Sequence, residues 1–188
     1  MNRHDARQGR HLLDLARQAI AETLGLAPGE PPSPPEPWLE APGAVFVTLT
    51  QHGELRGCIG SLEARRALID DLRANARAAA FSDPRFPPLE AEELGRTRVE
   101  VSILSRPEPM VFRNEADLLA QLRPNVDGVI LEQGWHRATF LPQVWEQLPE
   151  PRQFLAQLKR KAGLAPDFWA SDLQVARYGV EKFKEGPP

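Results

Sequence analysis

The residue with the clearest chemical potential is Cys58, the only cysteine of the chain, in the segment ELRGCIGSLE at 54–63. Alternation along a β-strand places Arg56 and Cys58 on one face, with their Cα atoms about 6–7 Å apart. A guanidinium at that distance favours the thiolate over the thiol. Gly57 and Gly60 leave room for a ligand or another backbone to approach. One hypothesis is therefore that Arg56 binds a small anion while Cys58 acts as a nucleophile or redox thiol.

A packed or ligand-lining thiol is the alternative, and the residue types favour it over catalysis. A free cysteine is among the most buried residue types, and glycines in a strand often mark a bulge or a corner. In this interpretation Arg56 pairs with a structural carboxylate, for which Asp83 and Glu100 are the candidates. Covalent catalysis also needs a base, and His52, the nearest histidine in sequence, lies in a predicted turn.

Four further polar residues are candidates for a cleft wall. The segment SDPRFPP at 82–88 holds Asp83 and Arg85 among three prolines, which would fix one acidic and one basic residue on a rigid loop. The same two residues also fit a local cap and a solvated charge, and the sequence leaves both readings open. Glu100 and Ser102 alternate with apolar residues in TRVEVSILS, so they line a cleft or face solvent, with solvent favoured.

The composition narrows the possible function classes. A net charge of −3 and a charged fraction of 26% are ordinary, so the global balance attracts neither nucleic acid nor an anionic membrane. The four histidines are scattered, and a single cysteine rules out an internal disulfide. No glycine-rich phosphate loop or dinucleotide fingerprint occurs, so no metal and no cofactor are predicted. Without an apolar leader or a membrane-length run, we expect a cytoplasmic protein.

Apolar periodicity predicts an α+β fold with a mainly antiparallel sheet and flanking helices. The order strand–strand–helix–strand occurs twice, at 43–105 and 127–183, which indicates a duplicated unit. The proline-rich segment 28–37 is predicted to be an extended strap. The expected helices are 8–26, 64–81, 114–122, 142–148 and 151–163, and the expected strands are 43–50, 55–61, 97–105, 128–134, 136–141 and 173–183.

Five motifs in sequence carry a family resemblance. They are LRGCIG (55–60), DPRFPPL (83–89), VEVSILS (99–105), ATFLPQV (138–144) and FLAQLKRKAGL (154–164). Together they resemble the AMMECR family, called AmmeMemoRadiSam system protein A in prokaryotes, over nearly the whole chain. The resemblance implies a single domain at about 10–184, with a larger and a smaller lobe, a cleft and a duplicated, barrel-like sheet. It also implies association with a Memo-type protein, similar to metal-dependent dioxygenases, and with a radical-SAM protein.

The residues and the resemblance together favour a binding role. The favoured function is an accessory component that holds an unknown small ligand or a partner for the Memo-like and radical-SAM proteins, because no complete catalytic constellation is visible. The alternative is an enzyme that uses Cys58 as its catalytic thiol. Nucleic acid has only local basic clusters in its favour, such as Lys159–Lys161, which also suits the last turn of a helix. The candidate ligand-binding or cleft residues are Arg56, Gly57, Gly60, Asp83, Arg85, Glu100 and Ser102.

Overall fold

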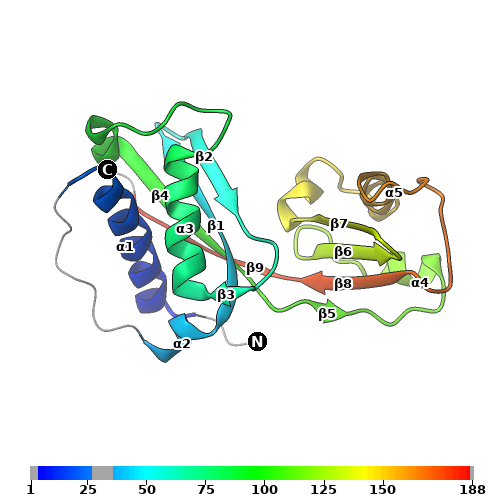
Figure 1. Cartoon of the computed structure of the whole chain (residues 1–188). Coiled ribbons are helices and arrows are strands. Elements are labelled where there is room, and N and C mark those ends of the chain that lie inside the picture. Colours follow the sequence, from blue (N-terminus) through cyan, green and yellow to red (C-terminus); the bar gives the residue numbers. More distant parts are fainter. Residues whose placement is uncertain (1–3, 27–35, 187–188) are drawn as a thin grey trace. The chain divides into compact units, whose positions relative to one another are not determined.

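The computed structural model describes residues 4–26 and 36–186, which divide into two compact units. Unit 1 is built from the chain up to Leu104 together with the residues from Glu181 onward, and unit 2 is the intervening segment Ser105–Val180. Figure 1 traces the elements of both units along the chain. The strap predicted at 28–37 lies outside the described residues, apart from its last two positions.

Unit 1 consists of a five-stranded sheet that packs against two long helices. Its elements are α1 (Ala6–Thr23), α2 (Pro37–Glu40), β1 (Pro42–Gln51), β2 (Glu54–Gly60), β3 (Arg66–Ala67), α3 (Leu68–Phe81), the 3₁₀ helix η1 (Ala91–Arg96), β4 (Thr97–Leu104) and β9 (Val180–Lys184). The strand order is β2-β1-β4-β9, with β3 paired to β1. β1 is antiparallel to β2, β3 and β4, so it is the central strand from which the sheet is organised.

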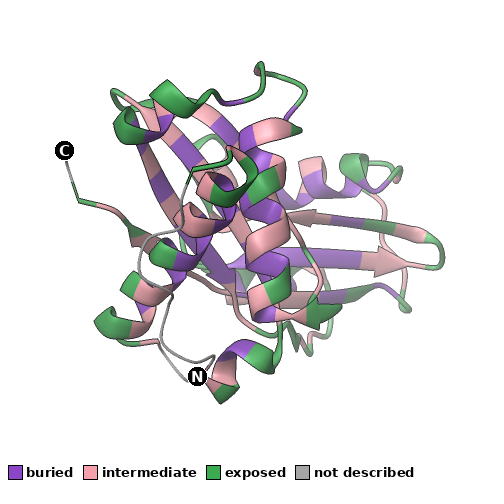
Figure 2. Ribbon diagram, turned by 60° about the vertical axis from the view of Figure 1, so that its left-hand side comes forward, coloured by how far each residue is buried: buried purple, intermediate pink, exposed green. Residues whose placement is uncertain are grey.

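Alternation along β1 separates the two faces of this sheet. Val45, Val47 and Leu49 are fully buried in the apolar cluster that α1 and α3 share with the sheet. Figure 2 shows the buried residues concentrated on the strands and on the sides of the helices packed against them. The other face carries mainly polar side chains, and we call it the polar face. Its residues are Phe46, Thr48, Thr50, Cys58, Gly60, Arg98, Glu100, Ser102, Lys182 and Lys184.

Unit 2 consists of a four-stranded sheet with its own apolar cluster. Its elements are β5 (Glu108–Pro109), α4 (Glu115–Gln121), β6 (Gly128–Gln133), β7 (His136–Phe140), the 3₁₀ helix η2 (Pro142–Glu146), α5 (Pro151–Lys161) and β8 (Gln174–Tyr178). The strand order is β5-β8-β6-β7, and the pairs are antiparallel. Trp145 and Phe154 stack in its core with ring centroids 3.7 Å apart.

The predicted order strand–strand–helix–strand is present twice, as β1-β2-α3-β4 and as β6-β7-α5-β8. In each copy the first strand lies between the second and the last, and it pairs antiparallel with both. The α+β class and the mainly antiparallel pairing are therefore confirmed. The described strands form two sheets instead of one barrel-like sheet, because each copy closes over a separate apolar cluster.

The final strand predicted at 173–183 is instead two strands in two sheets. β8 ends at Tyr178 in unit 2, and β9 begins at Val180 and joins unit 1. Gly179 stands between them; its backbone N–H donates to Ser105 Oγ at 2.8 Å, and its carbonyl accepts from Ser105 N at 2.9 Å. Because strand-forming residues such as Tyr178 and Val180 stand directly on both sides of Gly179, the sequence pattern resembles one strand and hides the change of sheet.

Two predicted helices also differ. The helix predicted from residue 64 begins at Leu68, because residues 66 and 67 pair with β1 as β3. The segment predicted as a helix at 142–148 is the short 3₁₀ helix η2. Among the helices of the described ranges, none combines the length and the apolar character that crossing a membrane requires.

Candidate functional site

Cys58 lies on β2, the outermost strand of its sheet, and is half-buried. It is paired with Thr48 of β1, whose hydroxyl lies 3.3 Å from Cys58 Sγ. On the outer edge of β2, the Cys58 backbone N–H donates to Asp83 Oδ2 at 2.9 Å, and its carbonyl accepts from Arg85 Nη2 at 3.3 Å. The loop 83–88 therefore occupies the backbone groups that an additional strand would otherwise bind.

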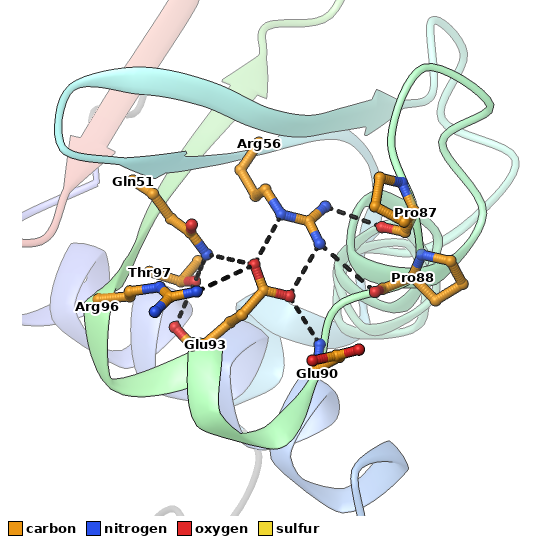
Figure 3. A network of polar contacts seen from close by, with 8 residues as sticks. All are labelled: Gln51, Arg56, Pro87, Pro88, Glu90, Glu93, Arg96 and Thr97. Carbon is orange, nitrogen blue, oxygen red and sulfur yellow. Dashed lines mark hydrogen bonds and ion pairs between the residues drawn. The ribbon is translucent and has the colours of Figure 1, made fainter.

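Arg56 does not share a face with Cys58 as predicted. Leu49 pairs with Gly57 and Thr50 with Leu55, so Arg56 is an extra residue, a β-bulge that breaks the alternation. Its guanidinium donates through Nε and Nη2 to both carboxylate oxygens of Glu93, at 3.0 and 2.9 Å. Figure 3 shows the remaining contacts, from Nη1 to Pro87 O at 2.9 Å and from Nη2 to Pro88 O at 3.4 Å.

The predicted partners of Arg56 are therefore wrong, since the pairing carboxylate belongs to Glu93 and not to Asp83 or Glu100. Arg56 and Glu93 are each 12% exposed, so little of either side chain faces solvent. Hydrogen bonding from Arg56 lowers the pKa of Glu93 to about 2. The guanidinium of Arg56 and the carboxylate of Glu93 neutralise each other inside unit 1. We therefore interpret this ion pair as a structural support for the β-bulge at Arg56.

Glu93 also accepts hydrogen bonds from polar groups of other elements, as Figure 3 shows. Gln51 Nε2, at the end of β1, donates to Glu93 Oε1 at 3.0 Å and to Thr97 Oγ1 at 2.9 Å. The backbone N–H of Glu90 donates to Glu93 Oε2 at 2.9 Å, which completes a capping box at the start of η1. Glu93 thus holds β1, β2 and η1 at one corner of the sheet.

Asp83 and Arg85 form a second ion pair, next to Cys58. Arg85 Nε and Nη2 donate to the two oxygens of Asp83 at 2.9 and 2.7 Å, and the Asp83 side chain is only 2% exposed. The hydrogen bonds from Arg85, followed by the one from the Cys58 N–H, hold the pKa of Asp83 far below its usual value. The Arg85 side chain is 54% exposed, and its pKa is raised mainly by Asp83, with a smaller contribution from Cys58.

Gly57 and Gly60 each allow another part of unit 1 to lie close to the backbone of β2. A side chain at Gly57 would collide with the backbone carbonyl of Ala79, so the absence of a Cβ lets α3 approach β2 closely. A side chain at Gly60 would collide with the ring of Phe46, which is on the polar face. Gly57 therefore serves helix packing, and Gly60 accommodates an aromatic neighbour.

Glu100 and Ser102 lie on the polar face, across β1 from Cys58. Thr48 pairs with Glu100 and Phe46 with Ser102 in the β1–β4 ladder. Glu100 Oε2 lies 2.7 Å from Lys184 Nζ, and Glu100 Oε1 lies 3.9 Å from Lys182 Nζ. At the level of Cys58 the polar face thus carries a row that runs from the thiol through Thr48 and Glu100 to the two lysines.

Sequence reasoning missed Glu93, Thr48 and the two lysines. The spacing Glu90–Glu93 matches a capping box, which is a usable signal for an ordered Glu93. Thr48 was hidden by the bulge, because counting back from the turn at His52 and Gly53 pairs Cys58 with Val47 instead. The lysines were hidden because 173–183 resembled one continuous strand.

Comparison with known proteins identifies the family of this chain. The family model of AMMECR1 matches residues 13–183. This chain belongs to the AMMECR1 family. A relative from Methanothermobacter thermautotrophicus is 42% identical over 182 residues, which cover 95% of this chain and 94% of the relative. The Saccharolobus solfataricus protein SSO0193 is 38% identical over 187 residues, covering 96% of this chain and 82% of that protein.

One solved structure shares the fold of this AMMECR1-family chain. It is the crystal structure of the uncharacterised protein PH0010 from Pyrococcus horikoshii, with a TM-score of 0.79 and 36% identity. The match covers 96% of this chain and 93% of that one. The fold of this family is thus shared with a solved structure.

The arrangement around Cys58 limits its chemistry. Asp83 and Glu93 are ionised and committed to arginines, so neither is available as a base for the thiol. Within 4–26 and 36–186, no three His, Cys, Asp or Glu side chains are grouped to hold a metal ion. On the polar face, the half-buried Cys58 thiol lies beside the Thr48 hydroxyl, with the Glu100 carboxylate across β1.

Proposed function

We propose that this AMMECR1-family protein is an accessory component that binds a small ligand or a partner segment, acting with Memo-like and radical-SAM proteins. The observation that supports this proposal is that the charged residues around Cys58 are bound to other residues of unit 1. Arg56 is bound to Glu93 and to two proline carbonyls, and Asp83 is bound to Arg85 and Cys58 N. A surface whose charges next to the thiol are already paired with one another suits binding better than proton transfer or covalent catalysis.

An enzyme that uses the Cys58 thiol is the second candidate. The Thr48 hydroxyl, 3.3 Å from Sγ, supports it, because a hydroxyl is a group that orients a thiol. The anion binder in such an enzyme would not be Arg56, whose guanidinium is occupied. The half-exposed Arg85, which donates to Cys58 O, is the better placed cation.

Alkylation of Cys58 separates the two candidates. The chain has one cysteine, so iodoacetamide incorporation measured by intact mass reports on this thiol alone. For a binding protein we expect the folded protein to react more slowly than the urea-unfolded protein. Arg152→Gln, at an exposed position of α5, should leave the rate unchanged, and Asp83→Asn should raise it by freeing the edge of β2. A folded protein that reacts faster than the unfolded chain would favour the enzyme instead.

Partner binding is tested with purified Memo-like and radical-SAM proteins by analytical ultracentrifugation. We expect a complex with at least one of them that Cys58→Ser leaves intact. A complex with neither protein at micromolar concentrations would overturn the accessory role.

A further inference from the structure

The polar face of unit 1 carries a local charge opposite to that of the whole protein. Its charged residues are Arg98, Lys182 and Lys184, which are basic, and Glu100, which is acidic. Three cations and one carboxylate give a formal charge of 3 − 1 = +2, whereas the whole chain has a net charge of −3. A basic surface on an acidic protein attracts anions selectively to that surface.

Two of these cations share a single carboxylate. Glu100 lies 2.7 Å from Lys184 Nζ and 3.9 Å from Lys182 Nζ. The Glu100 side chain is only 19% exposed, whereas Lys182 is 46% and Lys184 is 66% exposed. Glu100 therefore positions two ammonium groups that remain accessible to solvent, and it neutralises only one of them.

Arg98 is the third cation, and it is poorly satisfied within unit 1. Its Nε is buried without a hydrogen-bond partner among the described residues. Its Nη1 lies at 3.5 Å from Thr97 O, at the limit of a hydrogen bond. Arg98 pairs with Thr50 in the ladder, next to the pair formed by Glu100 and Thr48. Two hydroxyls thus lie on the strand beside the basic residues.

We infer that the polar face binds a small, multiply charged anion carrying phosphoryl or carboxylate groups. Lys182, Lys184 and Arg98 supply the charge, and Thr50, which pairs with Arg98 on the neighbouring strand, supplies a hydroxyl donor. Charge-assisted hydrogen bonds from these cations are stronger than neutral ones, and arginine adds the planar geometry that such oxyanions fit. This inference rests on the proposed ligand-binding function and assigns a chemical class to the ligand.

The test is isothermal titration of the full chain with pyrophosphate and, separately, with citrate, at constant ionic strength. Saturable binding of either probe is expected, and the two probes distinguish phosphoryl from carboxylate recognition. In Lys182→Gln/Lys184→Gln the affinity should fall by about tenfold or more, because two charge-assisted contacts are lost. The matched control is Arg152→Gln/Arg160→Gln, which removes two charges from exposed positions of α5 and should bind like the unmodified protein.

Arg98→Gln should weaken binding independently of the lysine pair, and its far-ultraviolet circular dichroism should match that of the parent protein. Absence of saturable binding by both probes would overturn the inference. An equal loss in the α5 control would also overturn it, because it would mean that net charge and not the polar face drives the association. Either result leaves the accessory role open, since complex formation with the partner proteins is measured separately.

Discussion

The two units share one strand and helix order but pack their helices onto their sheets differently. In unit 1, Gly57 and the alanines of α3 bring the helix backbone close to β2. In unit 2, by contrast, Phe154 of α5 packs against Phe140 of β7 with ring centroids 5.3 Å apart. The hairpins differ as well, because β6 and β7 pair without the register shift that β1 and β2 show at Arg56.

This difference shows how one topology can acquire a site in only one of its copies. The bulge moves Cys58 from the core face to the polar face, and the 83–88 loop then holds it by two backbone contacts. In unit 2 the outer strand β7 is held by side chains of α5 and β8 instead of a loop, through hydrogen bonds from Lys161 Nζ to Thr139 O at 2.9 Å and from Tyr178 Oη to Phe140 O at 3.1 Å. The local additions to the fold therefore accumulate around β2.

The largest loss of stability is expected from a substitution that disrupts the close packing of α3 on β2 in unit 1. Gly57→Ala should cost about 3 kcal/mol or prevent folding, because its Cβ meets a backbone carbonyl that cannot move alone. Gly95→Ala is the matched control and should change the stability by no more than about 0.5 kcal/mol, because a Cβ at this exposed position meets no atom within 4 Å. Urea unfolding measures both. Equal losses for the two variants would show that the approach of α3 to β2 does not constrain the sheet.

A medium loss of stability is expected when the Arg56–Glu93 ion pair, which supports the β-bulge, is weakened. Glu93→Gln should lower the stability of unit 1 by about 2 kcal/mol at neutral pH, because it weakens a charged hydrogen-bond network. The pKa of Glu93 falls from its usual 4.5 to about 2 in the folded state. Its contribution is therefore fully present above about pH 4.5 and is lost as the pH falls toward about 2.

Unfolding free energies measured from pH 7 to pH 2 check this pH dependence. The curves for Glu93→Gln and the parent protein should converge at the acid end, whereas the control Glu92→Gln should follow the parent throughout. A constant gap between the Glu93→Gln and parent curves would contradict the assigned pKa.

The smallest loss of stability is expected from substitutions at the ion pair of unit 2 that the buried Lys159 forms with Glu115. Lys159 lies in the last turn of α5, as predicted, and it is fully buried and donates to Glu115 Oε1 at 2.9 Å. Glu115→Gln should cost about 1–2 kcal/mol, since it leaves a buried ammonium without its carboxylate. Lys159→Met should be neutral or stabilising, because an apolar side chain of similar size replaces the ion pair. Amide hydrogen exchange should place both effects in unit 2, and a loss in Lys159→Met as large as that in Glu115→Gln would contradict the argument.

Much of the fold could be predicted from local sequence signals. Regular alternation in 97–105 and helical periodicity in 8–26 depend on a residue's immediate neighbours, so these elements lie close to where they were predicted. The small side chains Ala76, Ala79 and Ala80 on the buried side of α3 are a local signal of this kind for close packing on a sheet.

The site was less predictable because it depends on distant contacts. The bulge at Arg56 is supported by Glu93, 37 positions further along the chain, and no local pattern reports that contact. A regular hairpin would have paired Cys58 with Val47, so one inserted residue reverses which face the thiol occupies. The change of sheet at Gly179 likewise depends on its hydrogen bonds with Ser105.

The division of the last strand has a consequence for the order in which the protein is completed during synthesis. β9 pairs with β4, and Glu185 beyond it binds both Arg17 and the backbone N–H of Val99. The sheet that begins first therefore lacks an edge strand until Lys184, the last residue of β9, has left the ribosome, whereas the strands of unit 2 are all present by Tyr178. Domains often form in the order of synthesis, but here the later unit is the first to have its complete set of strands.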